Sequence, residues 1–122
     1  MGISAAESVI MEALWKQSPM AAEDIAGLVA DEQDWTEATV RTLINRLLKK
    51  KAIAAKKDGR RYLYRPVMKR ADWVHEESQG LLDRMFDGRL APLVTHFSQR
   101  TQLSPQDITD LKRLVRELDD GK

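Results

Sequence analysis

Residues 36–70 hold most of the side chains in this sequence that could carry chemistry. They include twelve basic side chains and two acidic ones, whereas residues 1–35 include one basic and seven acidic side chains. Arg41, Thr42 and Asn45 lie within one helical turn of each other in this block. Guanidinium, hydroxyl and amide groups can donate to and accept from the edges of nucleic-acid bases. The block predicts a phosphate- and base-binding surface, and the alternative from charge alone is a solvated basic face.

A helix starting near Thr36 is expected to position these groups. Apolar side chains recur at three- and four-residue intervals along it, namely Val40, Leu43, Ile44, Leu47 and Leu48. We expect Thr36 to cap the helix and Arg41 to contact guanine, with Asn45 on adenine or phosphate. Thr42 and Ala38 could meet a thymine methyl, and the helix edges would face phosphates. The DNA-binding residues predicted on this helix are Thr36, Ala38, Thr39, Arg41, Thr42, Asn45, Arg46 and Lys50.

A basic β-hairpin is expected directly after this helix. Asp58-Gly59 is a strong signal for a type I′ turn, and residues 61–65 alternate between polar and strand-forming side chains before Pro66. Four cations surround the turn: Lys56, Lys57, Arg60 and Arg61. We predict that Lys57, Arg60 and Arg61 grip the neighbouring DNA backbone or minor groove.

Two helices are expected before the helix that starts near Thr36. Ser4 and Glu7 have the spacing of a capping box, and Pro19 ends the first helix. A second helix over about 21–30 would turn Ile25, Leu28 and Val29 inward. Three helices followed by a basic hairpin are typical of a winged helix-turn-helix. We therefore predict a mainly α fold with a small β-hairpin wing, in which residues 1–67 form the DNA-binding domain.

Residues 68–122 are expected to form a helical dimerisation domain. Amphipathic helices are predicted over about 71–86, around Leu90–Phe97, and after the cap Ser104-Pro105. About fifty residues are too few for an independent core, so two copies should interlock; the alternative is packing onto their own winged domain. The predicted dimer contacts are Trp73, Leu81, Leu82, Met85, Phe86, Leu93, Phe97, Ile108, Leu111, Val115 and Leu118.

The sequence offers little for catalysis, so we expect no enzyme activity, no cofactor and no metal. It contains no cysteine, no Gly-rich phosphate loop and no Gly-x-Ser-x-Gly motif. His75-Glu76 begins like a zinc-protease motif, but Gln79 stands where the second histidine is required. Without a signal peptide or a long apolar run, a cytoplasmic location is expected.

Several segments together resemble the BlaI/MecI/CopY family of bacterial repressors, the penicillinase-repressor group. They are residues 6–15, WTEATVRTL at 35–43, NRLLKK at 45–50, GRRYLY at 59–64, LAPLVTHF at 90–97, and 103–105 with the helix that follows. The resemblance implies a homodimer that binds a palindromic double-stranded operator and represses resistance or stress genes. Copper-responsive members carry a C-terminal cysteine cluster, which this chain lacks.

The resemblance also implies a way to release the operator. Beta-lactam-responsive members are inactivated by cleavage of an Asn–Phe bond in the fifth helix, and His96-Phe97 stands in that place here. His96 and Phe97 are therefore the candidate cleavage site for a membrane-bound sensor metalloprotease. Two alternatives stay open: a winged-helix regulator switched by a small molecule at the dimer junction, and a winged-helix module for protein–protein contact whose binding is insensitive to salt.

Overall fold

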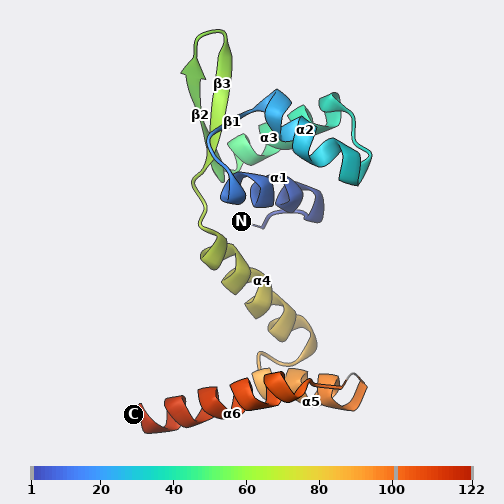
Figure 1. The fold of residues 1–122 in the computed structure, drawn as a ribbon, viewed down its shortest axis with the longest axis vertical. Helices are drawn as coiled ribbons and strands as arrows, with labels where there is room; N and C mark the ends of the chain where they lie inside the picture. Colours follow the sequence, from blue (N-terminus) through green and yellow to red (C-terminus); the bar gives the residue numbers. More distant parts are fainter. Residues whose placement is uncertain (1, 101, 122) are drawn as a thin grey trace. The chain divides into compact units, whose positions relative to one another are not determined.

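A computed structural model describes residues 2–100 and 102–121 of the chain. Within these residues the elements run in the order α1 (Ala5–Lys16), β1 (Met20–Ala21), α2 (Ala22–Gln33), α3 (Glu37–Lys49), β2 (Ile53–Asp58), β3 (Arg61–Pro66), α4 (Arg70–Met85), α5 (Leu90–Arg100) and α6 (Pro105–Asp120). Figure 1 shows β2 and β3 projecting as a hairpin beyond α1, α2 and α3. The predicted mainly helical fold with a hairpin wing is confirmed.

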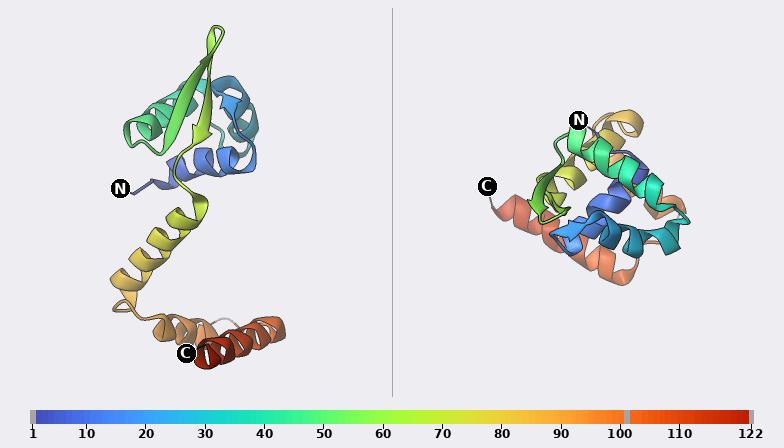
Figure 2. Two further views of the ribbon diagram at one scale, coloured as in Figure 1. Left: turned by 90° about the vertical axis from the view of Figure 1, so that its left-hand side faces the viewer. Right: turned by 90° about the horizontal axis from the view of Figure 1, so that it is seen from above.

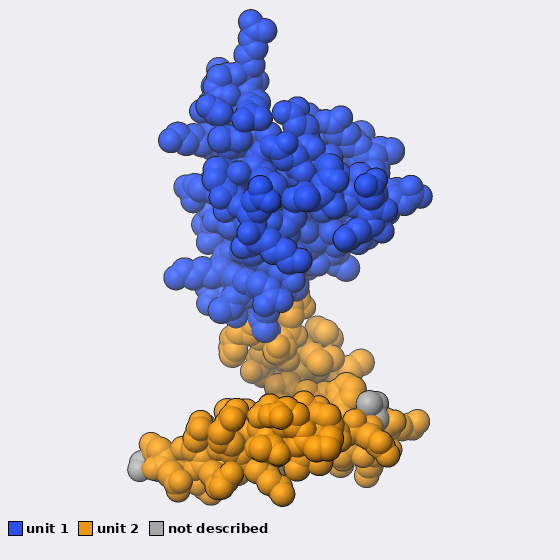
Figure 3. All heavy atoms as spheres, viewed as in Figure 1, with its two compact units in different colours: residues 1–74 blue, residues 75–122 orange. Residues whose placement is uncertain are grey.

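The chain divides into two compact units, residues 1–74 and 75–122 (Figure 3). The boundary lies within α4, later than the predicted division after residue 67. The first turn of α4 therefore belongs with the first unit, because its side chains contact α1.

The core of the first unit lies between α1, α2 and α3. Its fully buried side chains include Ile10 and Leu14 from α1, Ile25 from α2, and Ile44 and Leu47 from α3. The apolar residues whose spacing predicted these helices therefore face this core.

Two details of α2 differ from the sequence expectation. Leu28 is 51% exposed, because the buried pair Ile25 and Val29 defines the inward stripe and Leu28 lies beside it. The helix also continues to Gln33, beyond the expected end near residue 30, and closes at Asp34 in a left-handed conformation. The last turn of α2 is polar and exposed to solvent, so it lacks the apolar periodicity from which a helix is predicted.

The sheet has three strands in the order β1–β3–β2, all antiparallel (Figure 2). The sequence predicted the hairpin but missed β1, a two-residue strand whose Met20 pairs with Tyr64. The expected turn is also shifted by one residue. Asp58 pairs with Arg61, so Gly59 and Arg60 are the central residues, and of these two only Gly59 has a positive φ.

Candidate nucleic-acid interface

The rotation of α3 about its axis is set by its buried side. Val40, Leu43, Ile44 and Leu47 are at most 4% exposed. Thr36 caps the helix, and its hydroxyl accepts the Thr39 N–H at 3.2 Å. These contacts define where the helix starts and which side faces solvent.

The solvent side of α3 carries most of the polar residues expected to bind DNA. Seven of the eight predicted residues on this helix are exposed: Thr36, Ala38, Thr39, Arg41, Thr42, Asn45 and Arg46. The Thr42 hydroxyl donates to the Ala38 carbonyl at 3.0 Å, and Arg41 Nη2 donates to Glu37 Oε1 at 3.1 Å. The exposed side thus presents a guanidinium, an amide and hydroxyl groups on a fixed backbone.

The wing adds exposed cations beside α3. Lys57, Arg60 and Arg61 are all exposed around the hairpin turn. Arg61 lies 3.7 Å from a carboxylate oxygen of Glu23 and 3.7 Å from one of Asp58. These exposed pairs are weak and screened by salt, so they leave the guanidinium available to a phosphate.

A shallow hollow brings the recognition helix and the wing together. It has a volume of about 230 Å³ and lies within the first unit. Its walls come from β1, the start of α2, α3, the hairpin turn and β3: Ala21, Ala22, Glu23, Arg41, Arg60, Arg61, Tyr62 and Tyr64. Arg41 therefore lies both on the predicted base-reading side of α3 and in the hollow beside the wing, which is predicted to bind phosphates.

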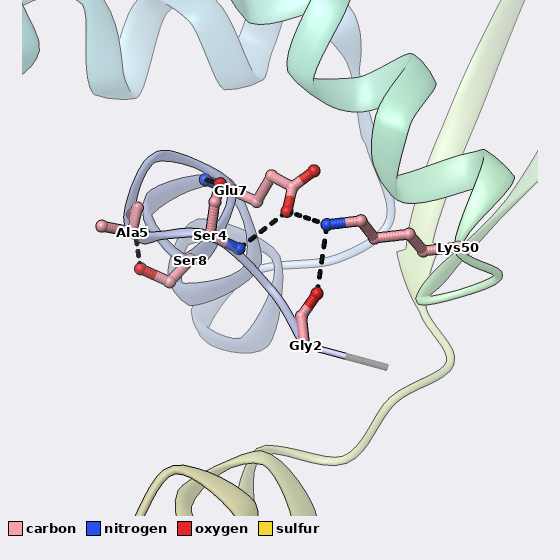
Figure 4. A network of polar contacts seen from close by, with 6 residues as sticks. All are labelled: Gly2, Ser4, Ala5, Glu7, Ser8 and Lys50. Carbon is pink, nitrogen blue, oxygen red and sulfur yellow. Dashed lines mark hydrogen bonds and ion pairs between the residues drawn. The ribbon is translucent and has the colours of Figure 1, made fainter. Parts of the chain in front are cut away.

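Lys50 differs from the other predicted contacts. Its ammonium donates to the Glu7 carboxylate and, at 3.1 Å, to the Gly2 carbonyl (Figure 4). Glu7 is 1% exposed and also accepts the Ser4 N–H at 2.8 Å in the capping box that the sequence predicted. The structure thus gives Lys50 an internal partner, which a phosphate would have to displace.

The electrostatics of this network favour the ionised carboxylate. Burial alone would raise the pKa of Glu7, but the hydrogen bonds from Lys50 and Ser4 outweigh it and leave that pKa below its ordinary value. Lys50 therefore joins the start of α1 to the C-terminal end of α3.

Trp73, predicted at the dimer contact, packs on Trp15 within the first unit, and its part in a dimer stays a prediction. Its ring lies 5.5 Å from that of Trp15, and the Trp15 indole N–H donates to the Met68 carbonyl at 2.9 Å. Next to it, Arg70 forms a two-point ion pair with Glu12, at 2.8 and 3.2 Å. The hydrogen bonds from Arg70 hold the pKa of Glu12 below its ordinary value. Trp73 shares an apolar helix pattern with the residues that follow it, so its contact with Trp15 had no local signal in the sequence.

The remaining predicted dimer contacts lie on α4, α5 and α6 or, for Phe86, directly after α4. None of the described residues of these three helices is buried. Large apolar side chains stand in solvent, including Met85 at 69%, Val115 at 59% and Leu118 at 73% exposure. The rest of the predicted set is half-buried or exposed: Leu81, Leu82, Phe86, Leu93, Phe97, Ile108 and Leu111. His96 and Phe97 are exposed within α5, with ring centroids 5.4 Å apart.

The sequence analysis missed three residues of this interface. Glu37 and Glu23 form ion pairs with Arg41 and Arg61 respectively, and Tyr62 lines the hollow beside them. The four-residue spacing of Glu37 and Arg41 was a usable signal, because such pairs meet on a helix. Nothing local indicated the contact of Glu23 with the wing, which depends on the fold.

Comparison with known proteins identifies the family. The profile described as penicillinase repressor matches residues 3–117. The chain belongs to the penicillinase repressor family. It is 30% identical over 115 residues to the penicillinase repressor of Bacillus licheniformis, covering 94% of this chain and 90% of the relative. It is also 30% identical to the methicillin resistance regulatory protein MecI of Staphylococcus aureus, covering 94% of each chain.

Solved structures agree with this family. The DNA-binding domain of the repressor BlaI matches with a TM-score of 0.53 and 31% identity, over 57% of this chain and 85% of that one. Monomeric Bacillus licheniformis BlaI, solved in complex with the blaP half-operator, matches with a TM-score of 0.53 and 30% identity, over 59% of this chain and 88% of that one. The family is one of repressors rather than enzymes.

The described residues contain neither a candidate metal cluster nor a membrane-spanning helix. Among residues 2–100 and 102–121, no three histidine, aspartate or glutamate side chains gather as a metal site would require. No helix in the same part of the chain combines the length and apolar character needed to cross a membrane.

Proposed function

We propose that this chain is a transcriptional repressor that binds palindromic operator DNA as a homodimer and controls resistance or stress genes. The observation that carries the proposal is the exposed polar side of α3, held against a buried apolar side and flanked by a cationic wing. A recognition helix of this kind fits the major groove, and the wing cations fit the adjacent backbone. The BlaI half-operator complex supports the same use of this fold.

The second unit supports the dimer part of the proposal. Its helices expose large apolar side chains that a second copy would cover, whereas residues 1–74 have a core of their own. Two linked winged domains bind two half-sites with an effective concentration that one domain lacks. Half-site centres are then expected about 10 base pairs apart or at a multiple of that distance.

Loss of the dimer would release the operator. We propose cleavage at His96-Phe97 by a membrane-bound sensor metalloprotease as the route, since this bond stands where the family's cleaved bond lies. The rings of both residues are exposed, but the bond is inside α5, so local opening of the helix must precede the cut.

Binding to DNA from upstream of the chain's own gene and its neighbours tests the function. Arg41→Ala should cost about 1–3 kcal/mol on the operator and relax sequence preference, because it removes a base contact. Arg61→Ala should weaken binding to all sequences alike and reduce the salt dependence, because it removes a phosphate contact. Fluorescence anisotropy at several salt concentrations distinguishes the two variants. If both variants lose the same affinity on every DNA sequence, the roles assigned to Arg41 and Arg61 are contradicted.

A further inference from the structure

An acidic side chain lies at the N-terminal end of α3, the helix proposed to enter the major groove. Glu37 is the first residue of α3 and one of only two acidic residues among 36–70, a stretch with twelve basic ones. Its side chain is 56% exposed and its Oε1 accepts from Arg41 Nη2 at 3.1 Å. A negative charge at this place opposes phosphate binding, so attraction to the DNA backbone does not explain it.

Folding explains only a small part of Glu37, because a carboxylate in the first turn of a helix gains only modest stabilisation from the helix dipole. The Arg41 side chain is 54% exposed, and exposed ion pairs of this kind add little to stability. The cap of α3 is already supplied by Thr36. The pair does, however, hold the guanidinium of Arg41 in a defined place on the exposed face, where it lines the hollow between α3 and the wing.

The pair keeps hydrogen-bonding capacity on both partners. Within the described part of the chain, the contact engages one guanidinium nitrogen and one carboxylate oxygen. Arg41 therefore retains donors for the O6 and N7 atoms of guanine, and Glu37 retains an oxygen that can accept.

The major groove offers few donors to a carboxylate. Guanine and thymine present acceptors there, and adenine places its N7 acceptor beside its N6 donor, where it repels a carboxylate. The N4 amino group of cytosine is the donor to which glutamate and aspartate are suited. A carboxylate facing guanine or thymine would be left unpaired in a strongly negative groove, and one facing adenine would gain the N6 donor but lie against the N7 acceptor.

We propose that Glu37 is a specificity-determining residue that accepts a hydrogen bond from a cytosine N4 amino group beside the guanine contacted by Arg41. This inference rests on the proposed function and extends it to the composition of the half-site. Glu37 acts in two ways: it positions Arg41, and it penalises sequences that lack cytosine at the neighbouring position.

Selection of duplexes from a random library tests the proposal. The wild-type full chain and E37A are each used to enrich sequences, because alanine removes the accepting oxygens. E32A is the control, since Glu32 is an exposed carboxylate at the end of α2. Wild type and E32A should enrich a half-site in which guanine and cytosine occupy adjacent base pairs. E37A should keep the guanine and lose the cytosine preference by about five- to tenfold, as expected for one base contact.

A modified base provides a second readout. N4-methylcytosine still pairs with guanine, but its methyl group can replace the groove-facing N4 hydrogen. Placed at the selected position, it should weaken wild-type binding by about five- to tenfold and leave E37A unchanged. E37A should also bind random DNA more tightly than wild type, since one negative charge near the phosphates is gone.

The outcomes separate this inference from the repressor function. An E37A motif identical to that of wild type, or an equal methylation effect on both proteins, would overturn the role of Glu37 and leave operator binding intact. A wild-type chain that enriches no motif would overturn both, because no sequence-specific binding would exist.

Discussion

The ion pair between buried Glu7 and half-buried Lys50 leads to a quantitative prediction about the stability of the fold. Glu7→Gln keeps the size of the side chain and its oxygen for the Ser4 N–H, but removes the charge that Lys50 binds. Glu7 is 1% exposed, whereas the Lys50 side chain is 29% exposed, so water relieves part of the unpaired ammonium's cost. We expect Glu7→Gln to lower the free energy of unfolding by about 2 kcal/mol. This value lies between the range for one charge-assisted hydrogen bond and the range for breaking a fully buried ion pair.

The effect should depend on pH in a defined direction. The pKa of Glu7 is lowered in the folded chain, so the ionised form stabilises the fold above the ordinary carboxyl value of 4.5. That contribution is lost as pH falls through the lowered folded pKa. The stability difference between wild type and Glu7→Gln should therefore be full at pH 7 and shrink progressively below 4.5.

Urea unfolding followed by circular dichroism measures both effects. Protein concentration must be held constant, because association contributes to apparent stability. Lys50→Met and the double variant complete a cycle, and the coupling of the two residues should account for most of the loss. A coupling near zero, or a difference that stays constant between pH 7 and acid, would refute the reasoning. A Lys50→Met variant that folds with wild-type stability but shows a weaker salt dependence of DNA binding would instead support the predicted contact between Lys50 and a phosphate.

Three further outcomes test the second unit and its junction. Val115→Asp should leave residues 1–74 folded but give monomers by sedimentation at micromolar concentration, since its side chain is 59% exposed and would lie in the proposed dimer contact; persistent dimers would contradict that contact. Trp73→Ala should lower stability by about 2–3 kcal/mol through lost packing on Trp15 while leaving the dimer intact, and sedimentation with urea unfolding separates the two. Beta-lactam treatment of cells should produce a C-terminal fragment starting at Phe97, seen by mass spectrometry, whereas derepression with an intact chain would favour a ligand-controlled switch.

Local patterns predicted the helices because each of them carries its own signals. Ser4 and Glu7 form the capping box expected from their spacing, and Ser104 caps α6 together with Asp107. The stripe from Val40 to Leu47 is buried, and the polar residues between its members face solvent. Helical periodicity links neighbours three and four residues apart, so the sequence alone determines which side of α3 is available to a ligand.

Tertiary structure decided what depends on partners far apart in the chain. β1 exists because β3 pairs with it, and two residues have no periodicity of their own. Lys50 was indistinguishable by sequence from the other cations of its helix until the fold placed Glu7, forty-three positions earlier, against it. Trp73 likewise belonged to an apolar helix pattern until Trp15 packed on it. Local spacing determines which side chains share a face, whereas long-range packing determines which of those side chains remain available to bind.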